Sequence, residues 1–303
     1  MKNIVVLGAG TAGTMAANML TKEKVFENWT ITVVDKNNDH EYQPGFLFVP
    51  FGMMPAKRIT KSRRKFLPKR AAFVQEDVVA IDRDAQVVVL ESGERLPYDQ
   101  LIIATGTVPR PDLVPGMEDG SLWYDKVFDF YTLKGAEGLK AKLKELKRGR
   151  LVVNVCEMPI KCPVAPLEFA LLAQDYLRKR GRGFDVDVVF VTPLDGAFTK
   201  PVASEALGHL LAERGIEVVT DFQIESIDNE RAELVSYDGR RVPFDLLATV
   251  PPNHGSKVAA DSGLADEAGF IEVDKHTLQA VADPHVWCAG DATNVPTSKA
   301  GSV

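Results

Sequence analysis

Short apolar runs alternate along the chain with longer amphipathic stretches, which is the pattern of strands and helices that follow one another. The first apolar run, Ile4 to Leu7, leads through a glycine-rich turn into a helix of small and apolar residues that extends to Leu20. The next run, residues 31–34, ends on Asp35. Strand, helix and strand in this order predict a βαβ unit in a parallel sheet.

The turn of this unit has the form Gly8-x-Gly10-x-x-Gly13. In such a turn the first glycine permits a tight bend, the second lets the backbone approach a pyrophosphate, and the third lets the helix pack closely on the strand. The phosphates would then lie at the positive end of the helix dipole. Asp35 ends the second strand, where a carboxylate can bind ribose hydroxyls. The pattern predicts a dinucleotide site, and the alternative is a glycine-rich turn without a ligand.

A second α/β unit begins with the apolar run 151–155, continues with a helix at about 166–180 and returns as the strand 186–191. Its turn is "NVCEMPIKCPVAPLE" (154–168), which holds two cysteines and three prolines instead of glycines. Proline lacks an N–H donor and stiffens the backbone, so this turn is a poor cradle for phosphate. The sequence therefore predicts that the second unit does not bind NADH.

The apolar run 101–104 closes the first unit at Ala104-Thr105-Gly106, and a later run at 244–250 reads as the strand that returns to it. We therefore expect an α/β protein with two Rossmann-like dinucleotide-binding domains, the second inserted in the first. The first domain would comprise residues 1–106 and 246–303. The second would comprise residues 107–245.

Composition narrows the functional classes. The 303-residue chain is 45% hydrophobic and carries a net charge of -6, which gives no reason to expect nucleic-acid binding. No apolar run reaches the ~18 residues of a membrane span, and Met1 leads straight into a strand, so we expect a cytoplasmic protein. Three cysteines are too few for a disulfide scaffold, and neither they nor the five histidines show metal-ligand spacing, so we expect no metal.

Three motifs follow one another along the chain: the glycine turn, Ala104-Thr105-Gly106 and Gly290-Asp291. Together they resemble the two-dinucleotide-fold flavoprotein reductases, which include disulfide reductases and type II NADH dehydrogenases. The resemblance implies FAD in the first domain, with the three glycines at its pyrophosphate and Asp35 at its adenosine ribose. It also implies that Val78 touches adenine through backbone atoms, that Thr105 and Gly106 close the pocket, and that Gly290 and Asp291 meet the ribityl or pyrophosphate region.

A narrower resemblance rests on "YQPGFLFVPFG" (42–52), "KCPVAP" (161–166), "FTKPVASE" (198–205) and "GDATNVPTSKAGSV" (290–303). These segments are similar to those of sulfide:quinone oxidoreductases, which implies sulfide and quinone as substrates. It also implies that Cys162 is the redox cysteine beside the flavin. Hydrosulfide would attack an oxidised cysteine pair and leave a persulfide, and the electrons would reach a quinone through FAD. Lys161 and the N-terminus of the next helix would favour the thiolate.

Three further residues have two interpretations each. Cys156 is either a buried strand-end thiol or a second thiol of the relay. Glu168 either moves protons or is a solvated glutamate near a helix start. Lys299 either stabilises the reduced flavin or is an exposed terminal lysine. We expect Cys288 to belong to the core, and the basic run 57–70 to be either a solvated loop or a site that attracts lipid headgroups or hydrosulfide.

The chain departs from this family in one respect. The family's second redox cysteine lies downstream of the Gly-Asp motif, in a segment that this chain lacks, so the resemblance implies a C-terminally truncated member. The membrane-binding segment of the family lies there too, and peripheral contact with the inner face of the cell membrane is expected through it. A homo-oligomer stays open.

Three other functions compete with this interpretation. They are the flavoprotein half of a flavocytochrome c sulfide dehydrogenase, a type II NADH dehydrogenase, and a non-catalytic FAD-binding interaction protein.

Overall fold

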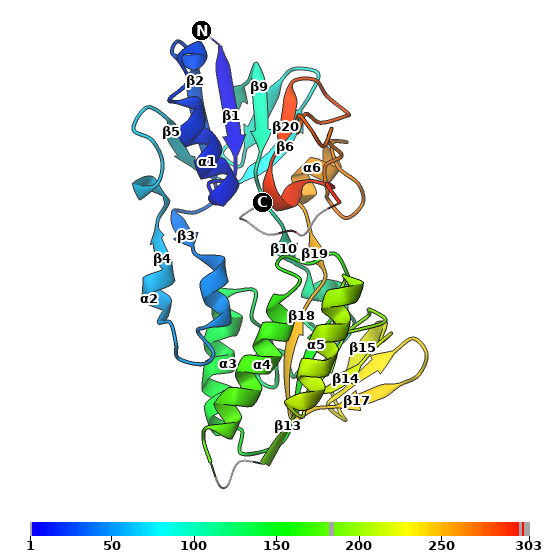
Figure 1. Ribbon diagram of the computed structural model, residues 1–303. Coiled ribbons are helices and arrows are strands. Elements are labelled where there is room, and N and C mark those ends of the chain that lie inside the picture. The colour runs from blue at the N-terminus through cyan, green and yellow to red at the C-terminus, as the bar shows by residue number, and fades with distance from the viewer. Residues whose placement is uncertain (1, 182–184, 297–298, 300–303) are drawn as a thin grey trace. The chain divides into compact units, whose positions relative to one another are not determined.

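The computed structural model describes residues 2–181, 185–296 and 299, and divides the chain into two compact units. The first unit is formed by Met1–Glu41, Thr60–Val108 and His254–Val303, and the second by Tyr42–Ile59 and Pro109–Asn253. The chain passes between them after Glu41, after Ile59, and at the short strands β10 (Val108–Pro109) and β19 (Asn253–His254). Each unit contains a parallel sheet that is covered on both faces (Figure 1).

The sheet of the first unit has the strand order β20-β9-β1-β2-β5, and its neighbouring strands are parallel. Side chains of β1 alternate between the two faces: Ile4 and Val6 pack in one apolar cluster and Val5 and Leu7 in another. A strand buried on both faces reads as a continuous apolar run, which explains the pattern at residues 4–7. Helix α1 covers one face, and a small antiparallel sheet and α6 cover the other.

The elements of the first unit have the following bounds: β1 (Asn3–Leu7), α1 (Thr11–Leu20), η1 (Lys24–Phe26), β2 (Thr30–Asp35), β3 (Asp39–Glu41), β4 (Thr60–Ser62), η3 (Arg63–Lys65), β5 (Ala72–Gln75), β6 (Val78–Asp82), β7 (Val87–Leu90), β8 (Arg95–Pro97), β9 (Gln100–Ile103), α6 (Lys257–Asp261), β20 (Val286–Cys288) and η5 (Gly290–Ala292). Strands β6, β7 and β8 form the antiparallel sheet.

The second unit repeats this arrangement with the strand order β11-β18-β12-β13-β14, again parallel. Along β12, Leu151 and Val153 pack in the apolar cluster that also contains α3, α4 and Leu211 of α5. Val152 packs in the cluster on the opposite face, with residues of the antiparallel sheet β15-β16-β17. The expected α/β class, with two Rossmann-like units and the second inserted in the first, is confirmed.

The elements of the second unit have the following bounds: η2 (Gln43–Leu47), α2 (Ala56–Ile59), η4 (Pro111–Leu113), β11 (Val127–Asp129), α3 (Leu133–Glu145), β12 (Arg148–Val155), α4 (Ala165–Arg178), β13 (Asp185–Val191), α5 (Pro201–Glu213), β14 (Glu217–Val219), β15 (Ile224–Asp228), β16 (Glu233–Ser236), β17 (Arg241–Pro243) and β18 (Leu246–Val250).

The boundaries differ from those expected at two places. Strand β18 was expected to return to the first domain at residue 246, but it lies between β11 and β12, with Leu246 opposite Leu151. Residues 42–59 also belong to the second unit, where the Phe51 ring packs 5.1 Å from that of Phe169. An apolar run shows that a strand is buried but not which strand it pairs with, because pairing is decided by distant residues. Within the described residues, no helix combines the length and the apolar character needed to cross a bilayer.

Candidate functional site

The glycine turn of the first unit joins β1 to α1, and its glycines are required at two positions. Gly8 has φ +94°, and a Cβ there would lie 2.5 Å from the carbonyl oxygen of Ala104. A Cβ on Gly13 would lie 1.8 Å from the carbonyl oxygen of Gly8, so α1 can approach the turn only without that side chain. Gly10 is the N-cap residue of α1, and apart from the adjoining backbone no described atom lies within 4 Å of the position where its Cβ would be. The turn therefore presents open backbone at the start of a helix, which suits a phosphate group.

Asp35 closes this turn from the end of β2. Its Oδ2 accepts a hydrogen bond from the Ala9 N–H at 2.8 Å and lies 3.0 Å from Nη1 of Arg63. Sequence reasoning missed Arg63, because it belongs to the basic run that was taken as either a solvated loop or an anion-attracting site. The Arg63 side chain is only 14% exposed and also binds Oδ1 of Asn37. The ribose contact expected for Asp35 stays a prediction.

Several predicted cofactor residues follow the carboxyl ends of the parallel strands, where α/β sheets bind their ligands. Thr105 follows β9, and its Cα would lie 3.1 Å from a Cβ on Gly8. The Thr105 hydroxyl is buried and has no hydrogen-bond partner among the described residues, so a polar ligand group could satisfy it. Gly290 begins η5, and a Cβ there would lie 3.1 Å from Cβ of Ala12 in α1. The fold thus brings three segments that are distant in sequence around one turn.

The remaining cofactor residues are less constrained. Gly106 has φ +66° and open space around it, and Asp291 lies within η5. Val78 begins β6, where it pairs with Leu90 before an irregularity in the strand. Its expected backbone contact with adenine stays a prediction.

Lys299 is buried in the first unit, at 7% exposure, so the expectation of an exposed terminal lysine was wrong. Its Nζ donates to the carbonyl oxygens of Thr293 at 2.6 Å and Asp291 at 3.2 Å, and lies 4.1 Å from the ring centre of Phe270. Burial lowers the pKa of this ammonium. These contacts tie Lys299 to the segment that follows β20.

The cysteine turn of the second unit joins β12 to α4. Cys162 is partly exposed and has φ +46°, a left-handed conformation that is uncommon for a residue with a side chain. Its carbonyl oxygen accepts a hydrogen bond from the Ala165 N–H at 2.9 Å, at the first residue of α4. Lys161 is buried, and its Nζ donates to Oε1 of Gln43 at 3.2 Å. The turn therefore holds one partly exposed thiol three residues before the start of α4, and a buried lysine precedes it in the sequence.

Cys156 lies in a different environment. Its Sγ donates to Oδ1 of Asn154 at 3.2 Å and lies 3.4 Å from Oγ1 of Thr249, inside the sheet. Burial raises the pKa of this thiol to about 12, so it keeps its proton near neutral pH. It packs in the cluster that faces the antiparallel sheet, whereas Cys162 contacts the cluster that contains the helices. These features favour the structural interpretation of Cys156 over the relay.

The remaining two candidates are Glu168 and Cys288. Glu168 is exposed in the first turn of α4, and its backbone N–H donates to the carbonyl oxygen of Val164. Cys288 is buried in β20, and burial raises its pKa to about 12, in keeping with a core residue.

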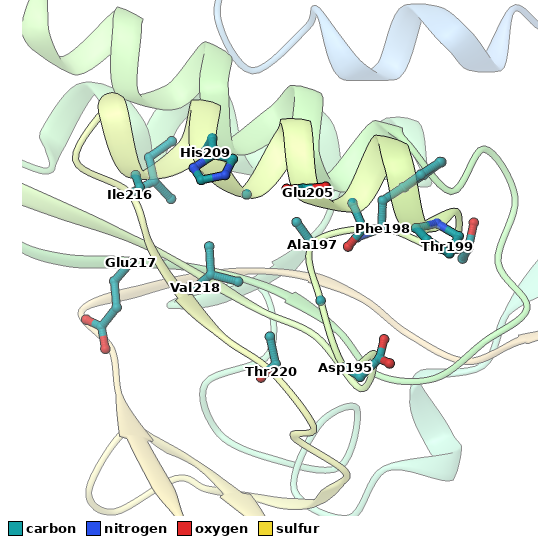
Figure 2. Close-up of a pocket in the computed structure, with 15 residues that line it drawn as sticks. Asp195, Ala197, Phe198, Thr199, Glu205, His209, Ile216, Glu217, Val218 and Thr220 are labelled. Atoms are coloured by element: carbon teal, nitrogen blue, oxygen red, sulfur yellow. The ribbon is translucent and has the colours of Figure 1, made fainter.

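A cavity of about 880 Å³ lies in the second unit, where it is lined by α5, β14 and the loop 195–199 (Figure 2). Figure 2 shows Glu205 and His209 on the helix and Glu217 on the other side. Of the described residues that line the cavity, three carry carboxylates and none is lysine or arginine. This charge would repel the phosphates of a dinucleotide. The cavity thus gives no support to NADH binding in this unit.

Comparison with known proteins gives consistent matches over nearly the whole chain. The family model described as "Pyridine nucleotide-disulphide oxidoreductase" matches residues 2–302. The chain is 29% identical to the mitochondrial sulfide:quinone oxidoreductase of Mus musculus and 32% identical to that of Dictyostelium discoideum, each over 98% of this chain. It spans 66% of the length of both relatives.

Solved structures extend this likeness to the fold. The crystal structure of the sulfide:quinone oxidoreductase from Aquifex aeolicus matches with a TM-score of 0.84 at 24% identity. The match covers 98% of this chain and 70% of that chain. At this identity the likeness concerns the fold alone.

Proposed function

Because the chain belongs to the pyridine nucleotide-disulphide oxidoreductase family, we propose that it is an FAD-dependent oxidoreductase that oxidises sulfide and passes the electrons to a quinone. Two curated relatives named as sulfide:quinone oxidoreductases support this choice of substrates. The chain spans 66% of their length, which is why the activity is proposed here rather than assigned.

The residues of the first unit fit FAD. Gly8, Gly10 and Gly13 would hold the pyrophosphate, since the turn has open backbone at the N-terminus of α1. The buried hydroxyl of Thr105 would gain a partner from the cofactor. Asp291 and Lys299 would lie along the same edge of the sheet. When bound, FAD supplies a two-electron acceptor between sulfide and quinone.

The observation that carries the proposal is the cysteine turn. In the position where a second dinucleotide fold needs glycines, the chain places an accessible thiol, Cys162, just before α4. The partial positive charge of a helix N-terminus and the nearby Lys161 favour a thiolate, which is the nucleophilic form of cysteine. Cys162 would hold the substrate sulfur as a persulfide. Its thiolate and hydrosulfide would join through a new sulfur–sulfur bond as they lose one proton to solvent and two electrons, which bound FAD would accept. Glu168, exposed in the same helix turn, would exchange protons with solvent.

The proposed quinone substrate has a consequence for the location of the protein in the cell. Quinones dissolve in bilayers, so an enzyme that reduces them has to reach a membrane surface. We therefore include peripheral contact with the inner face of the cell membrane, and binding of the protein to lipid vesicles in a sedimentation assay would test it.

The Cys162→Ser variant tests the role of the thiol. We expect it to bind FAD as the wild type does but to lose sulfide-dependent flavin reduction by about 100-fold or more, because serine is a far weaker nucleophile at neutral pH. After sulfide treatment of the FAD-loaded wild type, mass spectrometry should find one added sulfur on the peptide that contains Cys162.

The Cys156→Ser variant is the matched comparison, from the same unit and the same turn. Flavin reduction by sulfide should be retained in Cys156→Ser and lost in Cys162→Ser. Loss in both, with FAD still bound, would return Cys156 to the relay. Full activity of Cys162→Ser would end the proposal.

A further inference from the structure

Tyr131 lies against the cysteine turn in the second unit. Its side chain is buried, and its hydroxyl donates to the carbonyl oxygen of Lys161 at 2.6 Å. The same hydroxyl lies 3.3 Å from the carbonyl oxygen of Cys162. One phenol therefore binds two consecutive carbonyl groups of the turn.

These two carbonyls flank a strained backbone position. Cys162 has φ +46°, and a residue with a side chain keeps such a conformation only where its surroundings impose it. The residue before Cys162 is also held: the backbone N–H of Lys161 donates to Oδ1 of Asn253 at 3.3 Å. Together with the bond from the Ala165 N–H, these contacts hold the backbone from Lys161 to Cys162 at three points.

Tyr131 is itself held firmly. Its backbone N–H donates to Oδ1 of Asp129 at 2.9 Å, and its ring packs edge to face on Phe130 at 5.2 Å. Asp129 ends β11 and is buried, and it also accepts hydrogen bonds from the Thr132 N–H, the Thr132 hydroxyl and the Tyr124 hydroxyl. The anchor of the Tyr131 hydroxyl is thus the parallel sheet itself.

We propose that Tyr131 is a positioning residue, whose hydroxyl holds Cys162 in its left-handed conformation and so sets the place of the thiol at the start of α4. This inference rests on the proposed role of Cys162 as the redox thiol. Tyr131 acts only through the backbone of the turn.

The phenol suits this task over a wide pH range. Burial raises the pKa of Tyr131 well above its ordinary value, and the neighbouring Cys162 and Glu168 act in the same direction. The hydroxyl therefore stays protonated and remains a hydrogen-bond donor wherever the thiol reacts.

The Tyr131→Phe variant removes the hydroxyl and keeps the ring. The helix N-terminus favours the thiolate only while the sulfur stays near it, so release of the turn should lower the reactivity of Cys162. We expect alkylation of Cys162 by iodoacetamide, followed by mass spectrometry, to slow by about five- to tenfold, the effect of one lost hydrogen bond. In the FAD-loaded protein the limiting rate of flavin reduction by sulfide should fall equally, while the half-saturating sulfide concentration changes by less than about twofold.

Two further variants make the test specific. Tyr124→Phe removes another tyrosine hydroxyl that binds Asp129 but does not touch the turn, and it should react at the wild-type rate. Asn253→Ala frees the Lys161 N–H and should slow Cys162 as Tyr131→Phe does. If Tyr131→Phe loses FAD or fails to fold, Asn253→Ala still tests whether hydrogen bonds to the backbone of the turn set the reactivity of Cys162.

The outcomes separate this inference from the proposed function. Slower alkylation of Cys162 in a protein whose flavin does not respond to sulfide would support positioning and reject the function. Wild-type alkylation rates in both Tyr131→Phe and Asn253→Ala would overturn the positioning role.

Discussion

The two cysteines of one turn differ in the property that decides thiol chemistry. Cys156 is buried at the end of β12, where Asn154 and Thr249 bind its sulfur and burial keeps it protonated. Cys162 is partly exposed beside a helix N-terminus, in a strained conformation. Because the thiolate is the nucleophilic form of cysteine, we propose that Cys156 is the structural residue and Cys162 the reactive one.

The buried thiol gives a prediction on stability. In the folded protein the pKa of Cys156 rises from 9.0 to about 12. Above pH 9 the unfolded chain therefore loses this proton while the folded chain keeps it, so stability falls as pH rises, by up to about 1.4 kcal/mol per pH unit. In Cys156→Ala this contribution is absent, and urea unfolding between pH 9 and 10.5 should show a shallower decline than in the wild type.

Cys288 has the same shift in the other unit, so part of the slope should remain in Cys156→Ala. Equal slopes for wild type and variant would show that Cys156 ionises in the folded protein, which would contradict its structural role.

The roles of single residues could be predicted from the sequence where they depend on neighbouring residues in the chain. The glycine turn and Asp35 could be found from the sequence because the strands, the turn and the helix of this βαβ unit follow one another directly along the chain. The pairing of Asp35 with Arg63 could not, because it joins two distant segments. Burial of Lys299 and the hydroxyl contacts of Tyr131 were missed for the same reason.

Among the elements, the turn between β1 and α1 tolerates the fewest residue types, because a side chain at some of its positions would collide with backbone. A Cβ at Gly13 would overlap the backbone of Gly8, whereas a Cβ at Gly10 would meet open space. We expect Gly13→Ala to destabilise the protein by about 1–3 kcal/mol, as overpacking does. Gly10→Ala should fold with a change of less than about 0.5 kcal/mol but bind less FAD, because its methyl group would stand where the pyrophosphate approaches.

Thermal unfolding and the flavin absorbance of the purified protein measure both effects. Full FAD content in Gly10→Ala would contradict the pyrophosphate site proposed at this turn. Unchanged stability in Gly13→Ala would contradict the close packing of α1.

Element types were easier to predict than element partners. The apolar runs at 4–7 and 151–155 are strands buried on both faces, and this is visible in sequence. Strand β18 shows the same pattern, yet it was expected in the wrong unit, because nothing local distinguishes the sheet it joins. Residues 42–59 join the second unit through contacts such as Phe51 with Phe169, which the sequence alone does not reveal.

At the scale of the whole molecule, the same architecture occurs twice, with a different turn after the central strand of each sheet. Each unit has a parallel sheet between helices and a small antiparallel sheet. In the first unit the turn after the central strand keeps its glycines, and in the second it carries Cys162. The fold has been kept in both, and the ligand proposed for each differs with the turn.

This difference predicts which electron donor the protein accepts. The turn between β12 and α4 has no glycine for a pyrophosphate. The described lining of the cavity beside α5 includes three carboxylates and no lysine or arginine. The chain should therefore take electrons from sulfide through Cys162 and not from NADH.

Anaerobic mixing of the FAD-loaded protein with sulfide or with NADH, followed by flavin absorbance, tests this claim most directly. The account predicts prompt bleaching by sulfide and, at the same concentration of NADH, a rate at least about tenfold lower. Prompt bleaching by NADH with none by sulfide would contradict it.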